Sequence, residues 1–466
     1  GRVSEATPAI ASEAMARAAA GFPAWAATPA ETRAAALERL ADALEDNRER
    51  LMALLSAEAG KTLPDGLSEV REAADFCRYY AGEARRLFGA DTILPGPTGE
   101  ENRLVHRGRG VFVCISPWNF PLAIFLGQVT AALAAGNTVV AKPAEQTPLV
   151  AALAVKLAHD AGIPATALQF VPGDGAVGAA LIADPRVAGV AFTGSTEVAH
   201  LINRALAAKP GPIVPLIAET GGINAMIVDA TALPEQVTDD VVTSAFRSAG
   251  QRCSALRLLF VQEDVAPRMI EMITGAAKEL RLGAPVDPAT DVGPVIDAEA
   301  RDRLAAHVAE EKAAGRVIFE GATPTGALAA GTWVAPTVIE LKDAAELDRE
   351  HFGPILHVVR WKATELEKVC EAIAATGYGL TLGIHSRIES TIDAIEKRLS
   401  VGNVYVNRNM IGAVVGVQPF GGSGLSGTGP KAGGPGYLPR FALEQVIATN
   451  TAAAGGNATI MSLGEE

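Results

Sequence analysis

Short apolar stretches alternate with helical stretches over most of this 466-residue chain. Strand–helix–strand alternation with short connections builds a parallel sheet that is covered by helices on both faces. The alternation runs from residue 111 to residue 192, resumes after residue 219 and continues to about residue 406. The sequence therefore predicts an α/β protein with two doubly wound parallel-sheet domains. The best-defined strands are expected at 111–116, 138–141, 168–171, 187–192, 225–228 and 256–261.

The first 90 residues are predicted to be helical. The segment Thr28–Glu31 is interpreted as a capping box with proline at the first helical position, and leucines recur at helical spacing from there until Gly60. A second helix is expected at about 67–88. Glycines and prolines in residues 91–109 favour a hairpin, and the segment 444–463 predicts a terminal strand, with Val446, Ile447, Thr449 and Ile460 in alternation.

Composition excludes several classes of protein. The net charge of −13 disfavours nucleic acid or an acidic membrane as a partner. No run of 18 uninterrupted apolar residues predicts a membrane-spanning helix, and the N-terminus lacks a signal-peptide pattern. The four cysteines are far apart and no HExxH motif occurs, so we expect no metal site and a reducing, cytoplasmic compartment. Hydrophobic residues make up 49% of the chain, which fits a soluble enzyme with large cores.

One cysteine stands on a short loop between a predicted helix and a predicted strand. Residues 248–255 read Ser-Ala-Gly-Gln-Arg-Cys-Ser-Ala, and an apolar run begins directly afterwards. A side chain on such a loop is held firmly and stays accessible. As a thiolate, Cys253 would attack a carbonyl carbon. The alternative is that Cys253 is a small buried hydrophobe, as most free cysteines are.

Two glycine motifs follow predicted strands and are candidates for phosphate binding. Residues 173–178 read Gly-Asp-Gly-Ala-Val-Gly, the GxGxxG pattern of dinucleotide-binding turns. The acid expected about 20 residues later would be Glu197, but this residue belongs to a second motif, FTGSTEV at 192–198. There Ser195 opens a predicted helix whose free N–H groups attract anions, so we favour the second motif. Either motif alone is also compatible with an ordinary strand-to-helix turn.

Polar side chains stand at three further strand ends. Asn119, in the sequence PWNFP, would direct its amide at a developing oxyanion, or would stabilise a turn. Lys142 and Glu145 follow the next strand, where doubly wound sheets bind ligands, although a surface ion pair is the ordinary alternative. Glu219 precedes a glycine pair and is a candidate general base, or a solvated acid between two domains.

Taken together, these motifs resemble those of the aldehyde dehydrogenase superfamily, in the same order and over nearly the whole chain. More closely, the chain resembles the glutamate semialdehyde (pyrroline-5-carboxylate) dehydrogenase domain of bifunctional proline utilization A proteins, through residues 218–225, 250–254 and 412–435. Thr220 and Ile223 replace the usual Leu and Lys of the superfamily, a difference that we assign to this branch. The motifs that carry the resemblance are Pro117–Pro121, Lys142–Pro148, Phe192–Val198, Glu219–Gly222, Gly250–Ser254, Glu350–Pro354 and Pro419–Gly422.

The resemblance implies an NAD-dependent aldehyde dehydrogenase that needs no metal. The Cys253 thiolate would form a thiohemiacetal, whose oxyanion Asn119 and a backbone N–H would hold. Hydride would then pass to the nicotinamide, and Glu219 would activate water to hydrolyse the thioester. Glu145 would repel a 2′-phosphate, so NAD is expected rather than NADP; FAD is expected only in a proline dehydrogenase domain absent from this chain. The implied cofactor-binding residues are Trp118, Lys142, Glu145, Gly175, Ser195, Glu350 and Phe352.

The implied reaction is oxidation of L-glutamate γ-semialdehyde to L-glutamate in proline catabolism. Two phenylalanines would pack on the aliphatic part of the substrate, a nest of small residues would receive its α-carboxylate, and an acid would line the entrance. Another small semialdehyde, such as succinic semialdehyde, and a non-catalytic domain stay open as alternatives. A thiol hydrolase is disfavoured because no histidine motif accompanies Cys253. The implied substrate-binding residues are Phe120, Phe420, Ser254, Gly412, Ala413 and Glu72.

The resemblance also implies how the chain is divided. A β-flap would join subunits into a homodimer or a larger assembly, because exposed strand edges favour pairing. The chain is expected to be a domain excised from a larger bifunctional protein. The expected parts are an NAD-binding domain (1–90 and 109–218, with 411–443 returning to it), a catalytic domain (219–410) and the flap (91–108 and 444–466).

Overall fold

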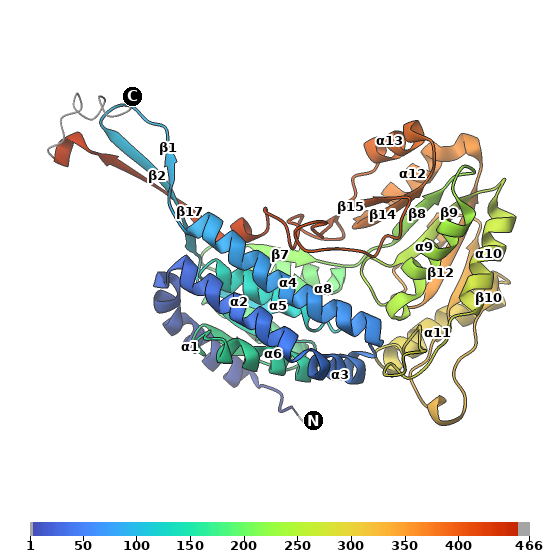
Figure 1. Ribbon diagram of the computed structural model, residues 1–466, viewed down its shortest axis with the longest axis horizontal. Coiled ribbons are helices and arrows are strands. Elements are labelled where there is room, and N and C mark those ends of the chain that lie inside the picture. The colour runs from blue at the N-terminus through green and yellow to red at the C-terminus, as the bar shows by residue number, and fades with distance from the viewer. Residues whose placement is uncertain (1–2, 455–466) are drawn as a thin grey trace.

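The computed structural model describes residues 3–454, which form two α/β units and a projecting β-ribbon (Figure 1). The first unit contains a five-stranded parallel sheet in the order β5-β4-β3-β6-β7. The chain moves from β3 outward to β5 and then returns to β6 on the other side of β3. Such a reversal creates a crevice at the carboxyl ends of the strands. The strands are β3 (Val111–Ile115), β4 (Thr138–Lys142), β5 (Leu168–Phe170), β6 (Val187–Thr193) and β7 (Leu216–Glu219).

Helices cover both faces of this sheet because its strands are apolar on both sides. Along β3, Phe112 and Cys114 face the core beneath α2 to α6, whereas Val111 and Val113 face the core beneath α1, α7 and α8. Alanine and leucine supply most of the first core. The helices are α1 (Pro8–Ala27), α2 (Ala30–Asp46), α3 (Arg48–Ala59), α4 (Leu63–Phe88), α5 (Ala123–Ala134), α6 (Pro148–Asp160), α7 (Gly175–Ala183) and α8 (Thr196–Ala208).

Two expectations for the N-terminal helices are wrong. The leucine-rich stretch is two helices rather than one, because the chain turns at Asn47 between α2 and α3. The expected capping box does not form: the hydroxyl of Thr28 donates to the carbonyl oxygen of Ala24 at 3.0 Å, because α1 ends at this point. Glu31 instead pairs with Arg85 on α4, at 2.7 Å. The ion pair with the neighbouring helix α4 therefore replaces the expected hydrogen bond between Glu31 and the backbone at Thr28.

The second unit contains a seven-stranded sheet in the order β10-β11-β12-β9-β8-β14-β15, in which only β10 is antiparallel. The two observed sheets confirm the predicted pair of doubly wound folds. The strands are β8 (Asn224–Val228), β9 (Leu256–Gln262), β10 (Val317–Glu320), β11 (Thr337–Leu341), β12 (Ile355–Trp361), β14 (Thr381–His385) and β15 (Asn403–Val406). The helices are α9 (Pro234–Phe246), α10 (Ala266–Lys278), α11 (Ala298–Ala313), α12 (Leu366–Ala375) and α13 (Glu389–Arg398).

The two sheets turn opposite ends of their strands toward each other. Glu219 is the last residue of β7 in the first unit, at a carboxyl end. Cys253 and Glu350 lie just before β9 and β12, at amino ends of strands in the second unit. The chain then returns to the first unit, where Tyr437, Leu438 and Phe441 join its core. On this return β16 (Ser423–Gly424) pairs with β13 (Tyr378–Gly379) of the second unit in a two-stranded sheet.

The projecting β-ribbon extends away from both units, at the upper left of Figure 1. It consists of β1 (Thr92–Leu94), β2 (Glu100–Gly108) and β17 (Ala442–Asn450), all antiparallel, which confirms the predicted hairpin. Ile93 is 66% exposed and Val446 61% exposed on it. Residues 455–466, including Ile460, lie outside the described part of the chain. None of the helices within residues 3–454 has the length and apolar character needed to cross a membrane.

Candidate active site

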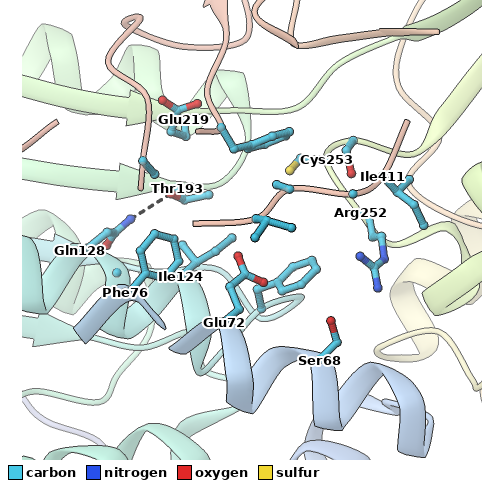
Figure 2. A pocket seen from close by; sticks show the side chains of 18 of the residues that line it. Ser68, Glu72, Phe76, Ile124, Gln128, Thr193, Glu219, Arg252, Cys253 and Ile411 are labelled. Atoms are coloured by element: carbon cyan, nitrogen blue, oxygen red, sulfur yellow. Dashed lines mark hydrogen bonds between the residues drawn. The ribbon is translucent and has the colours of Figure 1, made fainter. Parts of the chain in front are cut away.

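A cavity of about 270 Å³ lies between the two units (Figure 2). Its walls come from α4, the start of α5, the end of β7, the loop before β9 and the loop after Met410. These segments are far apart in the sequence, and the facing sheet edges bring them together. Eight of the predicted site residues line the cavity: Glu72, Phe120, Glu219, Cys253, Ser254, Gly412, Ala413 and Phe420.

The loop that carries Cys253 is held in an unusual backbone conformation. Ser248, Ala249 and Gly250 all have positive φ angles, of 55°, 54° and 64°. A Cβ atom on Gly250 would lie 2.1 Å from the carbonyl oxygen of Gly353, so only glycine fits there. Positive φ at two non-glycine residues stores strain, which is typical of functional loops. The surrounding structure therefore fixes where the loop presents its thiol.

The thiol of Cys253 faces the cavity in its protonated form. Burial raises the pKa of Cys253 to about 12, and the carboxyl groups of Glu350 and Glu219 add to the increase. Beyond the thiol, Asn224 donates hydrogen bonds to the carbonyl oxygens of Cys253 and Ala255, at 2.5 and 2.9 Å. A rigidly held thiol with this pKa needs a base or a change of environment before it becomes a nucleophile.

Asn119 is buried beside the same loop. Its Nδ2 donates to the carbonyl oxygen of Gln251 at 3.1 Å. Gln251 is held in turn, because its Oε1 accepts the N–H of Ile296 at 2.9 Å. A side-chain amide carries two N–H groups, so one hydrogen fixes Asn119 against the loop and the second is left for another acceptor.

Glu219 occupies a cradle of glycines on the opposite side of the cavity. Its Oε2 accepts the N–H of Gly422 at 3.2 Å. A Cβ atom on Gly421 would lie 2.8 Å from Oε1 and 2.8 Å from the carbonyl oxygen of Pro430, so the cradle requires a residue without a side chain there. Burial raises the pKa of Glu219 well above its usual value, which the Gly422 N–H and Lys431 only partly oppose. Glu219 thus rests as a buried carboxyl group that binds a proton readily.

Two helices, α7 and α8, begin at the carboxyl edge of the first sheet, and the N-terminus of α8 is better suited to bind an anion. The N-cap of α7 is Asp174, whose carboxylate accepts the N–H groups of Ala176 and Val177 at 2.9 and 3.3 Å. The N-cap of α8 is the neutral Ser195, whose hydroxyl accepts the N–H of Val198 at 3.3 Å. A carboxylate already compensates the positive end of α7, so the FTGSTEV motif is the better phosphate candidate.

The other predicted cofactor residues lie along the same crevice. Lys142 is buried at the end of β4, where its Nζ donates to the carbonyl oxygen of Pro143 at 3.1 Å and lies 3.8 Å from Glu145. Burial lowers the pKa of Lys142. Glu145 is half exposed, and Gly175 is the first residue of α7. Lys142 and Glu145 follow β4, and Gly175 follows β5, on one side of the point between β3 and β6 where the strand order reverses.

Glu350 reaches this crevice from the second unit. Its carboxylate accepts from Nη2 of Arg257 and from the N–H of Gly222, both at 3.3 Å. Burial raises the pKa of Glu350 to about 6, which Arg257 opposes. The ring of Phe352 packs edge-on against Trp118, with 5.5 Å between the ring centres, so these two aromatic residues connect the units.

Two buried charged residues that the sequence analysis did not identify, Lys61 and Glu69, pack behind the cavity wall at Phe120. Lys61 Nζ lies 3.8 Å from the ring centre of Phe120 and 3.0 Å from Glu69 Oε2, and both charged side chains are almost fully buried. Glu69 also accepts the N–H groups of Leu122 and Ala123, at 2.9 and 3.3 Å, which caps the start of α5. Arg252, which lines the cavity, lies 5.2 Å from the same ring centre, so Phe120 is held by charged groups on the cavity wall and behind it.

A second buried acid on α4 fixes the loop around Cys253. Asp65 accepts Nε of Arg247 at 2.7 Å and Nη2 of Arg252 at 2.9 Å. Glu72 follows on the same helix and points into the cavity (Figure 2), and burial raises its pKa to about 7. The spacing of acids at 65, 69 and 72 repeats on one face of a helix, and this was the available signal.

Comparisons with known proteins agree with this geometry. A model of the family described as "Aldehyde dehydrogenase family" matches residues 1–447. The bifunctional protein PutA of Klebsiella aerogenes is 54% identical over 449 residues, which are 95% of this chain and 33% of that protein. The chain thus spans about a third of the length of this relative.

Solved structures extend the comparison. A crystal structure of bifunctional proline utilization A superimposes with a TM-score of 0.95 at 68% identity, over 97% of this chain and 46% of that one. A Thermus 1-pyrroline-5-carboxylate dehydrogenase, solved with bound NAD, has a TM-score of 0.91 at 36% identity, over 96% of this chain and 87% of that one. The fold, the cavity and the family match together place this chain in the aldehyde dehydrogenase family.

Proposed function

We propose that this chain oxidises L-glutamate γ-semialdehyde to L-glutamate with NAD as the oxidant. The observation that carries the proposal is the shared cavity, which a thiol, a buried carboxyl group and a small-residue loop line together. The printed name of the Thermus relative, 1-pyrroline-5-carboxylate dehydrogenase, supports the substrate class. When bound, NAD would supply the acceptor for the aldehyde hydride.

Three residues would carry the covalent chemistry. Cys253 Sγ, after its proton has passed to solvent water, would bond to the aldehyde carbon to form a thiohemiacetal. The second N–H of the Asn119 amide and the Cys253 backbone N–H would hold the oxyanion. After oxidation of the hemiacetal to a thioester, Glu219 would take a proton from water, whose oxygen attacks the acyl carbon and releases the thiol. A raised pKa suits Glu219 to this task near neutral pH.

The crevice of the first unit fits a dinucleotide. We assign the pyrophosphate to the neutral-capped start of α8 at Ser195, because the positive end of a helix attracts phosphate. The buried ammonium of Lys142 and the carboxylate of Glu145 would bind hydroxyl groups of the adenosine ribose. Gly175, Trp118, Glu350 and Phe352 complete the proposed cofactor site.

The cavity wall would select the substrate by its charged end. Phe120 and Phe420 would pack on the methylene groups. Ser254 and the N–H groups of Gly412 and Ala413 would receive the α-carboxylate. Glu72 points into the same cavity (Figure 2) and also lines a neighbouring hollow together with Ala413, so it would line the entrance.

The test is steady-state NADH production by the purified chain. Glutamate semialdehyde, in equilibrium with pyrroline-5-carboxylate, and succinic semialdehyde are supplied in parallel, and Cys253→Ala serves as the inactive control. We expect turnover of the glutamate compound at a higher kcat/KM than the succinic one, and none with the variant. A preference for succinic semialdehyde would replace the assigned substrate, and full activity of the variant would remove the mechanism.

The division of the chain is also proposed. Residues 1–90, 109–218 and 411–443 would bind NAD, and residues 219–410 would carry the nucleophile. The ribbon would pair subunits into a homodimer or larger assembly, because its apolar side chains Ile93 and Val446 are exposed. All four cysteines lie in the described part and are free, which supports a reducing compartment such as the cytoplasm. We further propose that the chain is part of a longer bifunctional protein, since it spans a third of its PutA relative.

A further inference from the structure

A glutamate from the helical layer closes the amino end of α6. Glu58, on α3, accepts the N–H of Leu149 with Oε1 at 2.8 Å and the N–H of Val150 with Oε2 at 2.9 Å. The local N-cap residue, Thr147, makes no side-chain hydrogen bond to the helix. A carboxylate 91 residues away in sequence therefore compensates the positive end of a 13-residue helix.

This helix end lies at the proposed ribose site. Glu58 and Leu149 line a small hollow together with Glu145, Glu5 and Gly173. Glu145 is the residue assigned to the ribose of the adenosine half of NAD. Three carboxylates thus surround one small space at the carboxyl edge of the first sheet.

We propose that Glu58 is a specificity-determining residue, which makes the cofactor site select NAD over NADP by occupying the helix end that a 2′-phosphate would need. The proposal rests on the proposed function, because it assumes that the hollow receives the adenosine ribose. A ribose 2′-phosphate carries about −1.5 to −2 charges at neutral pH, like other phosphate monoesters. Such a group is stabilised where backbone N–H groups at a helix end are free. Here both oxygens of Glu58 already accept these groups.

Glu58 should contribute more to this selection than Glu145 does. Glu145 is 50% exposed, and solvent and salt screen the repulsion that an exposed carboxylate exerts. Glu58 is half-buried and held by two hydrogen bonds, so it cannot turn away without leaving the helix end uncompensated. Glu58 therefore opposes binding of a 2′-phosphate at the N-terminus of α6 both sterically and electrostatically.

The experiment compares cofactor selectivity in Glu58→Ala, Glu58→Gln and the control Glu49→Ala. Glu49 is an exposed glutamate on the same helix, so its removal changes the net charge equally without opening the hollow. We expect the ratio of kcat/KM for NADP to that for NAD to rise about tenfold in Glu58→Ala, corresponding to about 1.4 kcal/mol. Glu58→Gln should give a smaller rise, because one oxygen can still accept from the helix. Glu49→Ala should leave the ratio unchanged.

Binding of 2′,5′-ADP, measured by calorimetry, separates this inference from the proposed function because it needs no turnover. We expect Glu58→Ala to bind 2′,5′-ADP more tightly, relative to 5′-AMP, than the unmodified chain does. An unchanged ratio in both assays would overturn the role of Glu58, as would an equal rise in Glu49→Ala. If semialdehyde were not oxidised with either dinucleotide, the proposed function would fail, and the 2′,5′-ADP measurement would still decide the role of Glu58.

Discussion

The buried ion pair between Lys61 and Glu69 offers a sharp energetic test. The two side chains are 4% and 0% exposed, and the ammonium also covers the face of Phe120. Lys61→Met keeps most of the side-chain volume but leaves a buried carboxylate with only its two backbone donors. Breaking a buried pair from one side costs about 3–5 kcal/mol of the free energy of unfolding. We expect that loss in Lys61→Met, and a similar loss in Glu69→Gln.

The double variant Lys61→Met/Glu69→Gln should be far more stable than the two losses predict. Both charges are then absent, and replacing a whole buried pair is often nearly neutral. The lost contact between the ammonium and the Phe120 ring costs about 2 kcal/mol at a desolvated site. Two single losses of about 3–5 kcal/mol add to roughly 6–10 kcal/mol, against roughly 2 kcal/mol expected for the double variant. The coupling energy is therefore about 4 kcal/mol or more.

Denaturant unfolding of the complete chain measures this cycle, and half-lives for thermal inactivation replace it if unfolding is irreversible. Lys397→Met is the matched control, because Lys397 is 78% exposed and its pair with Asp393 is a surface contact worth about 0.5 kcal/mol or less. Additive losses, within about 0.5 kcal/mol, would show that Lys61 and Glu69 act independently and would refute the reasoning. Because Phe120 lines the cavity, KM for the semialdehyde should rise in Lys61→Met as well.

Three further outcomes follow from the loop around Cys253. Asn119→Ala should lower kcat by about 10²–10³-fold, as loss of one oxyanion donor does, and an unchanged kcat would remove its role. The rate of alkylation of Cys253 by iodoacetamide, measured without cofactor, should rise roughly tenfold per pH unit between about pH 7 and pH 10. Only the thiolate reacts, and the pKa of the thiol is about 12. A rate that reaches a plateau below pH 9 would contradict this expectation. Gly250→Ala should lose activity and melting temperature, because its Cβ would collide with Gly353, whereas Gly275→Ala on α10, with open space around it, should do neither.

The sequence pattern predicted the two sheets because parallel strands buried on both faces read as apolar runs. It also placed Cys253 and Glu219 at a loop and a strand end, and the family resemblance added Phe420; all three line the cavity. The break at Asn47 could not be predicted, because leucine spacing continues through it at helical period and tertiary packing decides the turn. Local capping rules failed at Thr28 for the same reason.

The supporting charges were harder to predict than the reacting groups. Glu69 and Asp65 bind backbone and side-chain donors 53 to 187 positions away. The spacing of the acids therefore indicates a shared helix face but not the groups that they contact. The glycine cradle of Glu219 is similar, because Gly421 is essential only where another segment approaches it. Long-range pairing determines these contacts, and a single sequence does not display it.

The opposed polarity of the two sheet edges has a consequence for how such a protein can diverge. Lys142 and Ser195, assigned to the dinucleotide, follow strands of one sheet, whereas Cys253 precedes a strand of the other. Substitutions in the loops that line the cavity can therefore change which aldehyde is accepted, while the dinucleotide site at the carboxyl edge of the first sheet is unchanged. An inherited scaffold of this kind can acquire new carbonyl substrates by changing a few loops and leaving both frameworks intact.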